Sequence, residues 1–167
     1  MRREKGIALL DISYTSDTMS DYLKDLREKT GHMPLLLPHA VVLLFNEKGE
    51  VLLEKRSDDG YYDFPGGGID LKETAEEAAK RELFEETGLI ADSLTLFKVY
   101  SGEITHYVYF NGDEIYGVDL VYICDKYHGE LKAQLEEVSS LAFFDIHNMP
   151  DKMSVRNKAI VKDYLNK

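Results

Sequence analysis

The chain has 167 residues, a formal net charge of −11, an apolar fraction of 44% and a single cysteine, Cys124. This length and composition predict one folded domain with its own core, and a lone cysteine excludes an internal disulfide and a CxxC zinc site. The acidic balance and the lack of a Lys/Arg stripe argue against binding to a nucleic-acid backbone. Phosphate chemistry is not excluded, because bound cations reverse the local sign of the charge.

The N-terminal segment contains no recognisable targeting or membrane signal. Its apolar run at 7–10 is broken by Asp11, and the sequence has no stretch of about 20 apolar residues. We therefore expect a cytoplasmic protein that does not bind membranes.

In chain order, the first predicted element is a short amphipathic helix at 17–30, which stops at Gly31. We assign residues 1–38 to an N-terminal helical extension packed on the core and residues 39–167 to the main domain. The runs 39–45 and 50–55 are rich in strand-forming residues. The Asn-Glu-Lys-Gly stretch between them predicts a hairpin.

A glycine-rich loop and a helix follow. Residues 56–70 contain Asp-Asp-Gly and Pro-Gly-Gly-Gly, which favour a loop. Residues 73–87 have no Gly or Pro and are rich in helix formers, and Gly88 is placed as a C-terminal cap.

The second half of the chain predicts more strands and a closing helix. Strands are expected at 94–100, 105–110, 114–125 and 141–144, with a hairpin turn at Asn111-Gly112, and a helix is expected at 154–165 with Ser154 as its cap. These elements predict an α+β fold of the α/β/α sandwich type, a mixed β-sheet between helices.

The helix at 73–87 carries an unfavourable charge pattern. Glu82, Glu85 and Glu86 stand at i, i+3 and i+4, so a helix places them close together on one face. Glu85 and Glu86 also lie in the last turn, where the helix dipole disfavours anions. Arg81 can relieve Glu85, whereas Glu82 and Glu86 have no local basic partner. A solvated acidic face is one interpretation, and a bound divalent cation such as Mg²⁺ is the other.

The spacing of the motif is more specific than this charge argument. Residues 67–89 fit G-x5-E-x7-R-E-U-x-E-E-x-G-U at every fixed position, where U is apolar. On these residues the chain resembles the Nudix hydrolase family (MutT-like), and a looser similarity extends over 39–150.

The resemblance implies a fold, a reaction and a set of roles. Family members hydrolyse a diphosphate linkage in a nucleoside diphosphate joined to another group, with Mg²⁺ or Mn²⁺. The implied metal ligands are the side chains of Glu82, Glu85 and Glu86 and a carbonyl of Gly66 or Gly67.

The implied supporting roles fall on further residues. Arg81 and Glu73 would orient the glutamates. The general base would be Glu82 or a later carboxylate, for which Glu137 is favoured among Glu103, Glu114, Glu136 and Glu137.

The substrate is expected to be a small nucleotide-like molecule. We expect it to contact Arg56, Gly66, Gly67, Tyr62 and Tyr107. Nucleoside triphosphates, dinucleoside polyphosphates and ADP-ribose or ADP-sugars stay open, although the lack of Pro between 65 and 150 weakens the ADP-ribose interpretation.

Two further function classes compete with hydrolysis. One is a Nudix-fold binding module without turnover, which the complete set of motif carboxylates disfavours. The other is an isomerase of the isopentenyl diphosphate type, for which no matching cysteine motif occurs. A homodimer is one assembly that we consider.

Overall fold

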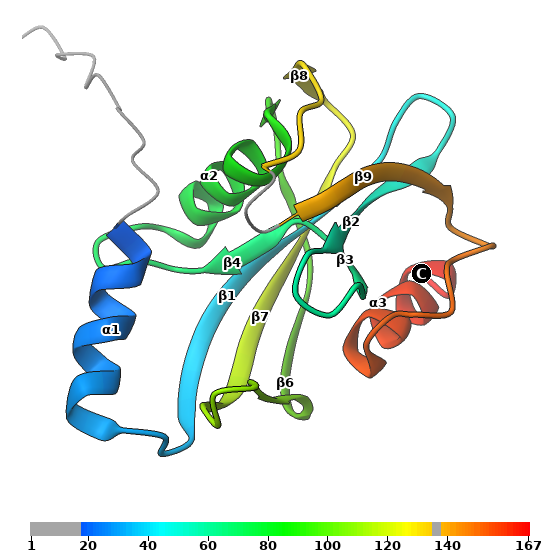
Figure 1. Cartoon of the computed structure of the whole chain (residues 1–167). Helices are drawn as coiled ribbons and strands as arrows, with labels where there is room; N and C mark the ends of the chain where they lie inside the picture. The colour runs from blue at the N-terminus through cyan, green and yellow to red at the C-terminus, as the bar shows by residue number, and fades with distance from the viewer. Residues whose placement is uncertain (1–17, 135–137) are drawn as a thin grey trace, which may run out of the picture.

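The computed structural model describes residues 18–134 and 138–167, and Figure 1 shows the arrangement of its elements. The helices are α1 (Thr18–Thr30), α2 (Ala75–Thr87) and α3 (Val155–Leu165). The strands are β1 (Leu35–Leu44), β2 (Glu50–Arg56), β3 (Tyr62–Asp63), β4 (Gly66–Gly68), β5 (Leu89–Ala91), β6 (Thr95–Val108), β7 (Glu114–Cys124), β8 (Tyr127–Gly129) and β9 (Val138–Asp145).

The strands form one mixed sheet and two smaller antiparallel sheets. The larger sheet has the order β4-β1-β7-β6, in which β1 and β7 run parallel and the other neighbours run antiparallel. The second sheet has the order β3-β2-β9, and β5 pairs with β8. The mixed sheet predicted from the sequence is confirmed.

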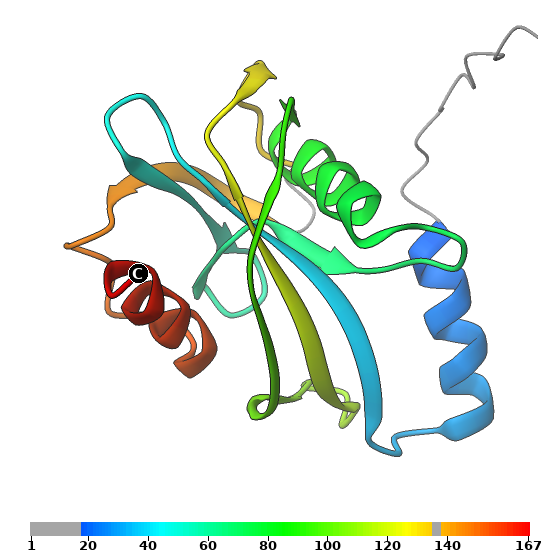
Figure 2. The ribbon, with the colours of Figure 1, turned by 180° about the vertical axis from the view of Figure 1, so that it is seen from behind.

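Strand β1 separates two apolar layers. Its residues Ala40 and Val42 face a cluster that contains Leu83 of α2, whereas Val41 faces a cluster that contains Ile160 of α3. The two views in Figures 1 and 2 show α2 and α3 on opposite sides of the sheets. This two-sided burial explains why β1 reads as a continuous apolar run, and it confirms the sandwich of helices around a sheet.

The predicted hairpin between the first two strands is confirmed only at its turn, because β1 and β2 do not pair beyond it. The turn itself forms, since Oδ1 of Asn46 accepts hydrogen bonds from the N–H groups of Lys48 and Glu50, both at 3.0 Å. Beyond one bridge between Phe45 and Val51, however, β1 and β2 enter different sheets. Both edges of β1 are already occupied by β4 and β7, so β2 pairs with β3 and β9 instead.

The predicted hairpin at Asn111-Gly112 is confirmed, because it joins the antiparallel strands β6 and β7. Gly112 has a φ of 87°, which suits a residue without a side chain. The two strands expected at 94–100 and 105–110 are in fact one strand, β6, with an irregular register between Ser101 and His106. At that irregularity the hydroxyl of Thr105 donates to the carbonyls of Gly102 and Gly117 at 2.9 and 2.8 Å.

The motif helix has well-formed ends. At its start, the Thr74 hydroxyl accepts from the N–H of Glu77, and the Glu77 carboxylate accepts from the N–H of Thr74 at 2.8 Å. At its end, Gly88 adopts a φ of 73° and donates to the Phe84 carbonyl. An N-cap of this kind stabilises a helix by about 1 kcal/mol. The predicted helix is thus confirmed, with its first residue at Ala75 rather than 73.

The ends of the described chain show smaller differences from expectation. Helix α1 forms as predicted from Thr18, while residue 17 lies outside the described residues. Arg27 joins α1 to the rest by donating to the carbonyls of Met33 at 2.7 Å and Glu114 at 2.9 Å.

Strand β1 begins at Leu35, inside the segment assigned to the extension. The division at residue 38 and the role of α1 stay predictions. Ser154 caps α3 as expected.

Candidate active site

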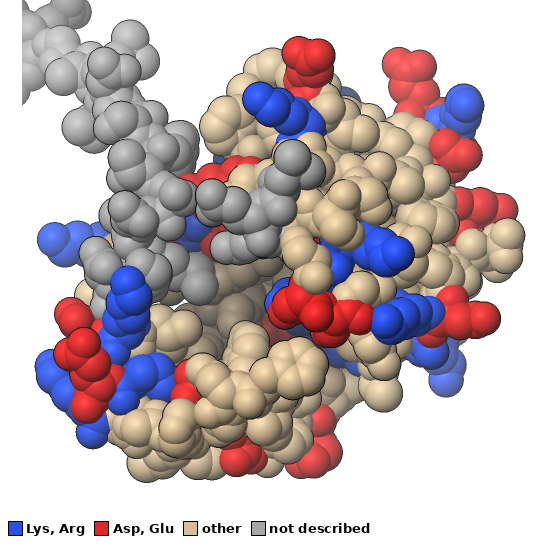
Figure 3. All heavy atoms as spheres, in the orientation of Figure 1, with Lys and Arg blue, Asp and Glu red and all other residues tan. Residues whose placement is uncertain are grey.

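A pocket of about 980 Å³ opens beside the last turns of α2. Its walls come from β2, the β3–β4 segment, α2, β6, β7 and the start of α3. Figure 3 views the molecule from the face where the surface is hollowed, with acidic side chains at the edge of the hollow. All of the predicted Nudix-motif carboxylates in the last turns of α2 line this pocket, namely Glu82, Glu85 and Glu86.

The glycine loop passes close to α2 and to β1. A Cβ on Gly66 would collide with the carbonyl oxygen of Ala40, and a Cβ on Gly67 would lie 2.5 Å from the Glu82 carboxyl group. The N–H of Gly66 donates to Oε2 of Glu86 at 2.9 Å. The two glycines are therefore required by close approach, one to backbone and one to a motif carboxylate.

Arg81 organises the carboxylates around it. Its Nε and Nη2 donate to the two oxygens of Glu73 at 2.8 and 3.0 Å, and Nη2 also donates to the Gly68 carbonyl at 3.0 Å. Its Nη1 donates to Oε1 of Glu82 at 2.7 Å and to Oε2 of Glu85 at 3.2 Å. The expectation that Glu82 lacks a local basic partner is wrong, because the guanidinium fork reaches both neighbours at once.

Glu86 is a buried motif carboxylate, with the same 8% exposure as Glu82. Burial, followed by the negative charges of Glu54 and Glu82, raises the pKa of Glu86 well above its ordinary value. Glu54 of β2 is 4% exposed and lines the same pocket. Glu54 was not predicted from the sequence, although it follows the buried Leu52 by two residues and alternate residues of a strand share a face.

The donor set fits a hard divalent cation. Glu54, Glu82, Glu85 and Glu86 offer carboxylate oxygens, which Mg²⁺ and Mn²⁺ prefer. Within residues 18–134 and 138–167, no three His, Cys, Asp or Glu side chains already surround a single point in the manner of a metal site. Arg81 holds one oxygen of Glu82 and one of Glu85, so a cation would use their other oxygens or turn these side chains.

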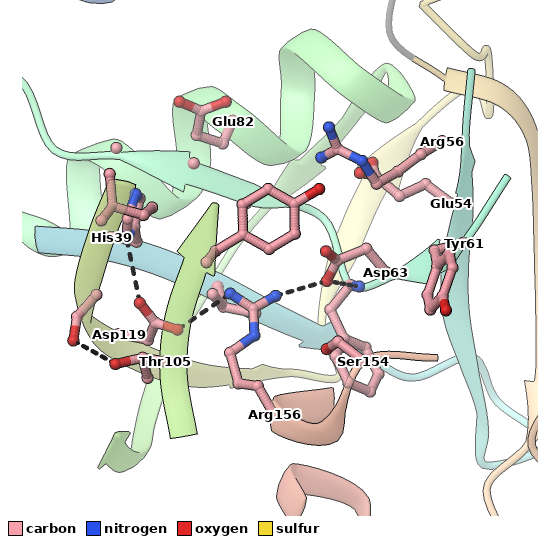
Figure 4. Close-up of a pocket in the computed structure, with 18 of the residues that line it drawn as sticks. His39, Glu54, Arg56, Tyr61, Asp63, Glu82, Thr105, Asp119, Ser154 and Arg156 are labelled. Carbon is pink, nitrogen blue, oxygen red and sulfur yellow. Dashed lines mark hydrogen bonds and ion pairs between the residues drawn. The ribbon is translucent and has the colours of Figure 1, made fainter. Parts of the chain in front are cut away.

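A second polar network lies in the same pocket, and Figure 4 shows its labelled members. Asp119 of β7 is 1% exposed and accepts from Nδ1 of His39 at 3.1 Å and from Nη1 of Arg156 at 3.0 Å. Burial alone would raise the pKa of Asp119, but the His39 hydrogen bond and the Arg156 charge hold it below its usual value. Nη2 of Arg156 also donates to Oδ1 of Asp63 at 2.7 Å.

The residues expected to contact substrate also line the pocket. Arg56 is paired with Asp58 through Nε at 3.0 Å and Nη2 at 2.6 Å, and this hydrogen bonding lowers the pKa of Asp58. The Tyr62 ring packs edge-on against Phe144. Tyr107 is 40% exposed, with its ring edge-on to a neighbouring tyrosine.

The four candidates for a distal general base differ in where they lie relative to the pocket. Glu137, the favoured one, lies outside the described residues, as does Glu136. Glu103 lines the pocket, whereas Glu114 pairs with His106 at 2.9 Å. The pocket residues that the sequence did not single out include Glu54, Asp63, Asp119, Arg156 and His39.

A mixed sheet between helices, with a carboxylate-bearing helix behind a glycine loop, defines a class of hydrolases that act on pyrophosphate bonds. The chain belongs to the Nudix family, since the family model described as NUDIX domain matches residues 35–164. Members of this family generally need a divalent metal ion and act on small nucleotide-like molecules.

Individual relatives agree with this assignment. The chain is 35% identical over 129 residues to an ADP-ribose pyrophosphatase of Methanocaldococcus jannaschii, covering 75% of this chain and 72% of that protein. It is 48% identical over 61 residues to a putative 8-oxo-dGTP diphosphatase of Bacillus subtilis, covering 36% of this chain and 41% of that one. The second match thus spans less than half of either protein.

Solved structures support the fold. A MutT NUDIX hydrolase from Burkholderia pseudomallei superposes with a TM-score of 0.65 at 24% identity, covering 76% of this chain and 96% of that one. At this identity the likeness establishes the fold alone. In the described part of the chain no helix has the length and apolar character needed to cross a membrane.

Proposed function

We propose that this chain hydrolyses a diphosphate linkage in a nucleoside diphosphate joined to another group. In this proposal Mg²⁺ or Mn²⁺ is held by Glu82, Glu85 and Glu86, with a carbonyl of Gly66 or Gly67. The observation that carries the proposal is that all three carboxylates line one pocket immediately behind the glycine loop. When bound, the cation neutralises phosphate charge and lowers the pKa of a coordinated water.

The protein's own contribution is mainly positioning. Glu73 and Arg81 form a rigid fork that fixes the direction of Glu82 and Glu85, so we assign both as positioning residues. Gly66 holds Glu86 through its N–H. These contacts keep the carboxylates close together despite their mutual repulsion, ready to receive positive charge.

Substrate contacts are assigned to the other walls of the pocket. Arg56 is a third exposed and provides positive charge for a phosphate group, while Tyr62 and Tyr107 offer ring surface to a base or sugar. Glu82 or a later carboxylate takes the proton of the attacking water. The assignment of Glu137 to that role stays a prediction.

The names of the relatives do not agree on a base, since one names an adenine nucleotide and the other a guanine nucleotide. A pocket of this kind in an acidic protein without a Lys/Arg stripe favours a small molecule over a polynucleotide. Cytoplasmic location and a homodimer stay predictions.

Hydrolysis is tested by incubating the full chain with Mg²⁺ or Mn²⁺ and a substrate panel. The panel contains nucleoside triphosphates, ADP-ribose, ADP-sugars and dinucleoside polyphosphates, and products are separated by chromatography. We expect turnover of at least one class, lost on Glu86→Gln and retained on Glu76→Gln, an exposed glutamate in the first turn of the same helix. A folded protein that binds nucleotides but turns over none of them would instead be a binding module.

A further inference from the structure

The wall of the pocket formed by α3, β3 and β7 contains a charged network to which the proposed function assigns no role. Arg156 lies between Asp119 and Asp63, at 3.0 and 2.7 Å. Gly117 makes room for Asp119 and His39, because a Cβ there would collide with Oδ1 of Asp119 and lie 3.3 Å from Nδ1 of His39. Burying such charges is costly, and a ligand that the arrangement recognises would offset this cost.

The network leaves hydrogen-bonding groups available to a ligand. A guanidinium has five N–H groups, and Arg156 uses three of them, on Asn157, Asp119 and Asp63. One N–H remains on each of the adjacent Nη1 and Nη2, and neither has a partner among the described residues.

Asp63 likewise has one carboxylate oxygen that is fully engaged and one that is available to a ligand. Its Oδ1 accepts from Arg156, from Asn157 Nδ2 at 2.8 Å and from the N–H of Phe64 at 2.8 Å. Its Oδ2 accepts from no group in the described parts of the chain, and Asp63 is one of the residues that line the pocket. The pocket therefore presents two adjacent N–H donors next to a carboxylate acceptor.

This pattern complements guanine and opposes adenine. Guanine carries the acceptors N7 and O6, which an arginine binds with two hydrogen bonds, and next to O6 it carries the donor N1–H, which suits a carboxylate. In adenine the donor and acceptor at these two positions are exchanged. Its N6 amino group would face the Arg156 donors, and its N1 lone pair would face the Asp63 carboxylate. Leaving buried polar groups unpaired in this way weakens binding strongly.

Aromatic side chains line the same pocket and provide a surface on which a base stacks. Tyr107, Tyr109 and Phe110, from the β6–β7 hairpin, all reach the pocket. Burial raises the pKa of Tyr109, while the charges of Arg56 and Arg156 act in the opposite direction, so its phenol lies within the field of both cations. Stacking on tyrosine tolerates any base, which leaves the choice of base to the hydrogen-bonding edge.

We propose that Asp63 and Arg156 select a guanine base, so that the chain acts on guanine nucleotides in preference to adenine nucleotides. This inference rests on the proposed hydrolase function for its kinetic test. It assigns specificity, and no chemical step, to the two residues.

The test compares matched pairs of substrates that differ only in the base. With Mg²⁺, kcat/KM is measured for GTP against ATP and for GDP-glucose against ADP-glucose. We expect a preference for guanine of roughly 10- to 100-fold, the discrimination that one well-placed bidentate contact provides. Equal rates on both bases, or a preference for adenine, would overturn the inference and leave the hydrolase assignment intact.

One variant should change the preference itself. In Asp63→Asn the three donors around Oδ1 keep the amide oxygen in place, so the amide NH₂ takes the position of Oδ2 and faces the pocket. We expect the ratio of guanine to adenine to fall at least tenfold, because an acceptor has become a donor. Asp92→Asn, which changes an exposed aspartate paired with His128 outside the pocket, should leave the ratio unchanged.

A binding measurement separates the two proposals. Calorimetry with the non-hydrolysable α,β-methylene analogues of GDP and ADP reports base preference without turnover. Tighter binding of the guanine analogue without hydrolysis of any substrate would support the base assignment and refute the hydrolase. If Asp63→Asn does not fold by circular dichroism, Arg156→Lys replaces it, since lysine keeps the charge but loses the paired donors.

Discussion

Gly66 and Glu86, 20 residues apart in the chain, are joined by a hydrogen bond of 2.9 Å from the backbone N–H to Oε2. This bond fixes the glycine loop to the helix that carries the motif carboxylates. It also stabilises the ionised form of Glu86, against a larger opposing effect of burial and of the neighbouring Glu54 and Glu82. The metal-free site is therefore under electrostatic strain at neutral pH, and this strain has measurable consequences.

The first consequence is a loss of stability of the metal-free protein as pH rises. The pKa of Glu86 is higher in the folded chain than in the unfolded chain. Its contribution to folding is therefore fully present below the unfolded pKa and is lost as pH rises through the folded pKa. We expect the Tm of the wild type in EDTA to fall more than that of Glu86→Gln between about pH 5 and about pH 8.

Magnesium should reverse this loss. A cation that binds only the folded state raises its stability by linkage, so Mg²⁺ should raise the Tm of the wild type at about pH 8 and leave that of Glu86→Gln nearly unchanged. Scanning calorimetry measures both effects. Parallel pH profiles of the two proteins in EDTA would show that Glu86 is not strained.

The second prediction concerns the two glycines of the loop, which differ in what they approach. Gly66→Ala places a methyl group against the backbone of Ala40 and Val41, which cannot move aside, so we expect a loss of about 2 kcal/mol or more in unfolding free energy. In Gly67→Ala the three atoms nearest to the new Cβ all belong to the carboxyl end of Glu82, a flexible side chain. We expect it to fold normally but to bind Mg²⁺ about 10-fold more weakly or worse.

Urea unfolding and magnesium calorimetry distinguish the two variants. Equal losses of stability would contradict the separation of roles between the two glycines. Gly49→Ala is the control for the alanine itself, because Gly49 also has a positive φ but its Cβ would meet no atom within 4 Å.

The third prediction concerns the fork formed by Arg81. Arg81→Lys keeps one positive charge but cannot bind Glu73, Glu82 and Glu85 together. We expect magnesium affinity and kcat to fall about 10- to 100-fold, the usual effect of losing a group that orients metal ligands. The nucleotide KM at saturating Mg²⁺ should change little, because Arg81 is fully engaged with the protein. A change confined to KM would mean that Arg81 contacts the substrate.

Local patterns in the sequence identified the elements that are determined locally. The helix α2 and its Gly88 cap follow from composition and from an αL position, and the Asn111-Gly112 turn follows from backbone preference. The prediction that β1 pairs with β2 failed because the pairing of a strand depends on all the strands of the sheet and not on the adjoining turn alone. The Asn46 turn forms, but β1 lies between β4 and β7, so β2 belongs to the other sheet.

The residues of the site also fall into two groups, those predicted from local spacing and those that only the fold brings together. The carboxylates of the motif lie within one helix, so their spacing alone predicted that they would share a face. The other charged residues of the pocket come from four different elements, and only the folded chain brings them together. They are Glu54 of β2, Asp63 of β3, Asp119 of β7 and Arg156 of α3. No spacing rule relates residues separated by up to 102 positions, so Asp63 and Arg156 became candidates only through their 2.7 Å contact and its neighbours.

The last prediction isolates the influence of Glu54 on Glu86. Glu54→Gln removes a negative charge that, after burial, is the largest cause of the raised pKa of Glu86. Glu86 should then ionise at lower pH, and the metal-free variant should keep its stability further into the neutral range than the wild type does. Carbon-13 NMR of the glutamate carboxyl groups in EDTA measures the titration directly.

Glu47→Gln is the matched control for this experiment, because Glu47 is an exposed glutamate in the turn between β1 and β2. It removes the same formal charge without reaching the pocket, so the Glu86 titration should not move. If Glu86 titrates at the same pH in the wild type and in Glu54→Gln, the two carboxylates do not interact. The clustering of negative charge would then depend on Glu82 and burial alone, and Glu54 would have no part in preparing the site for a cation.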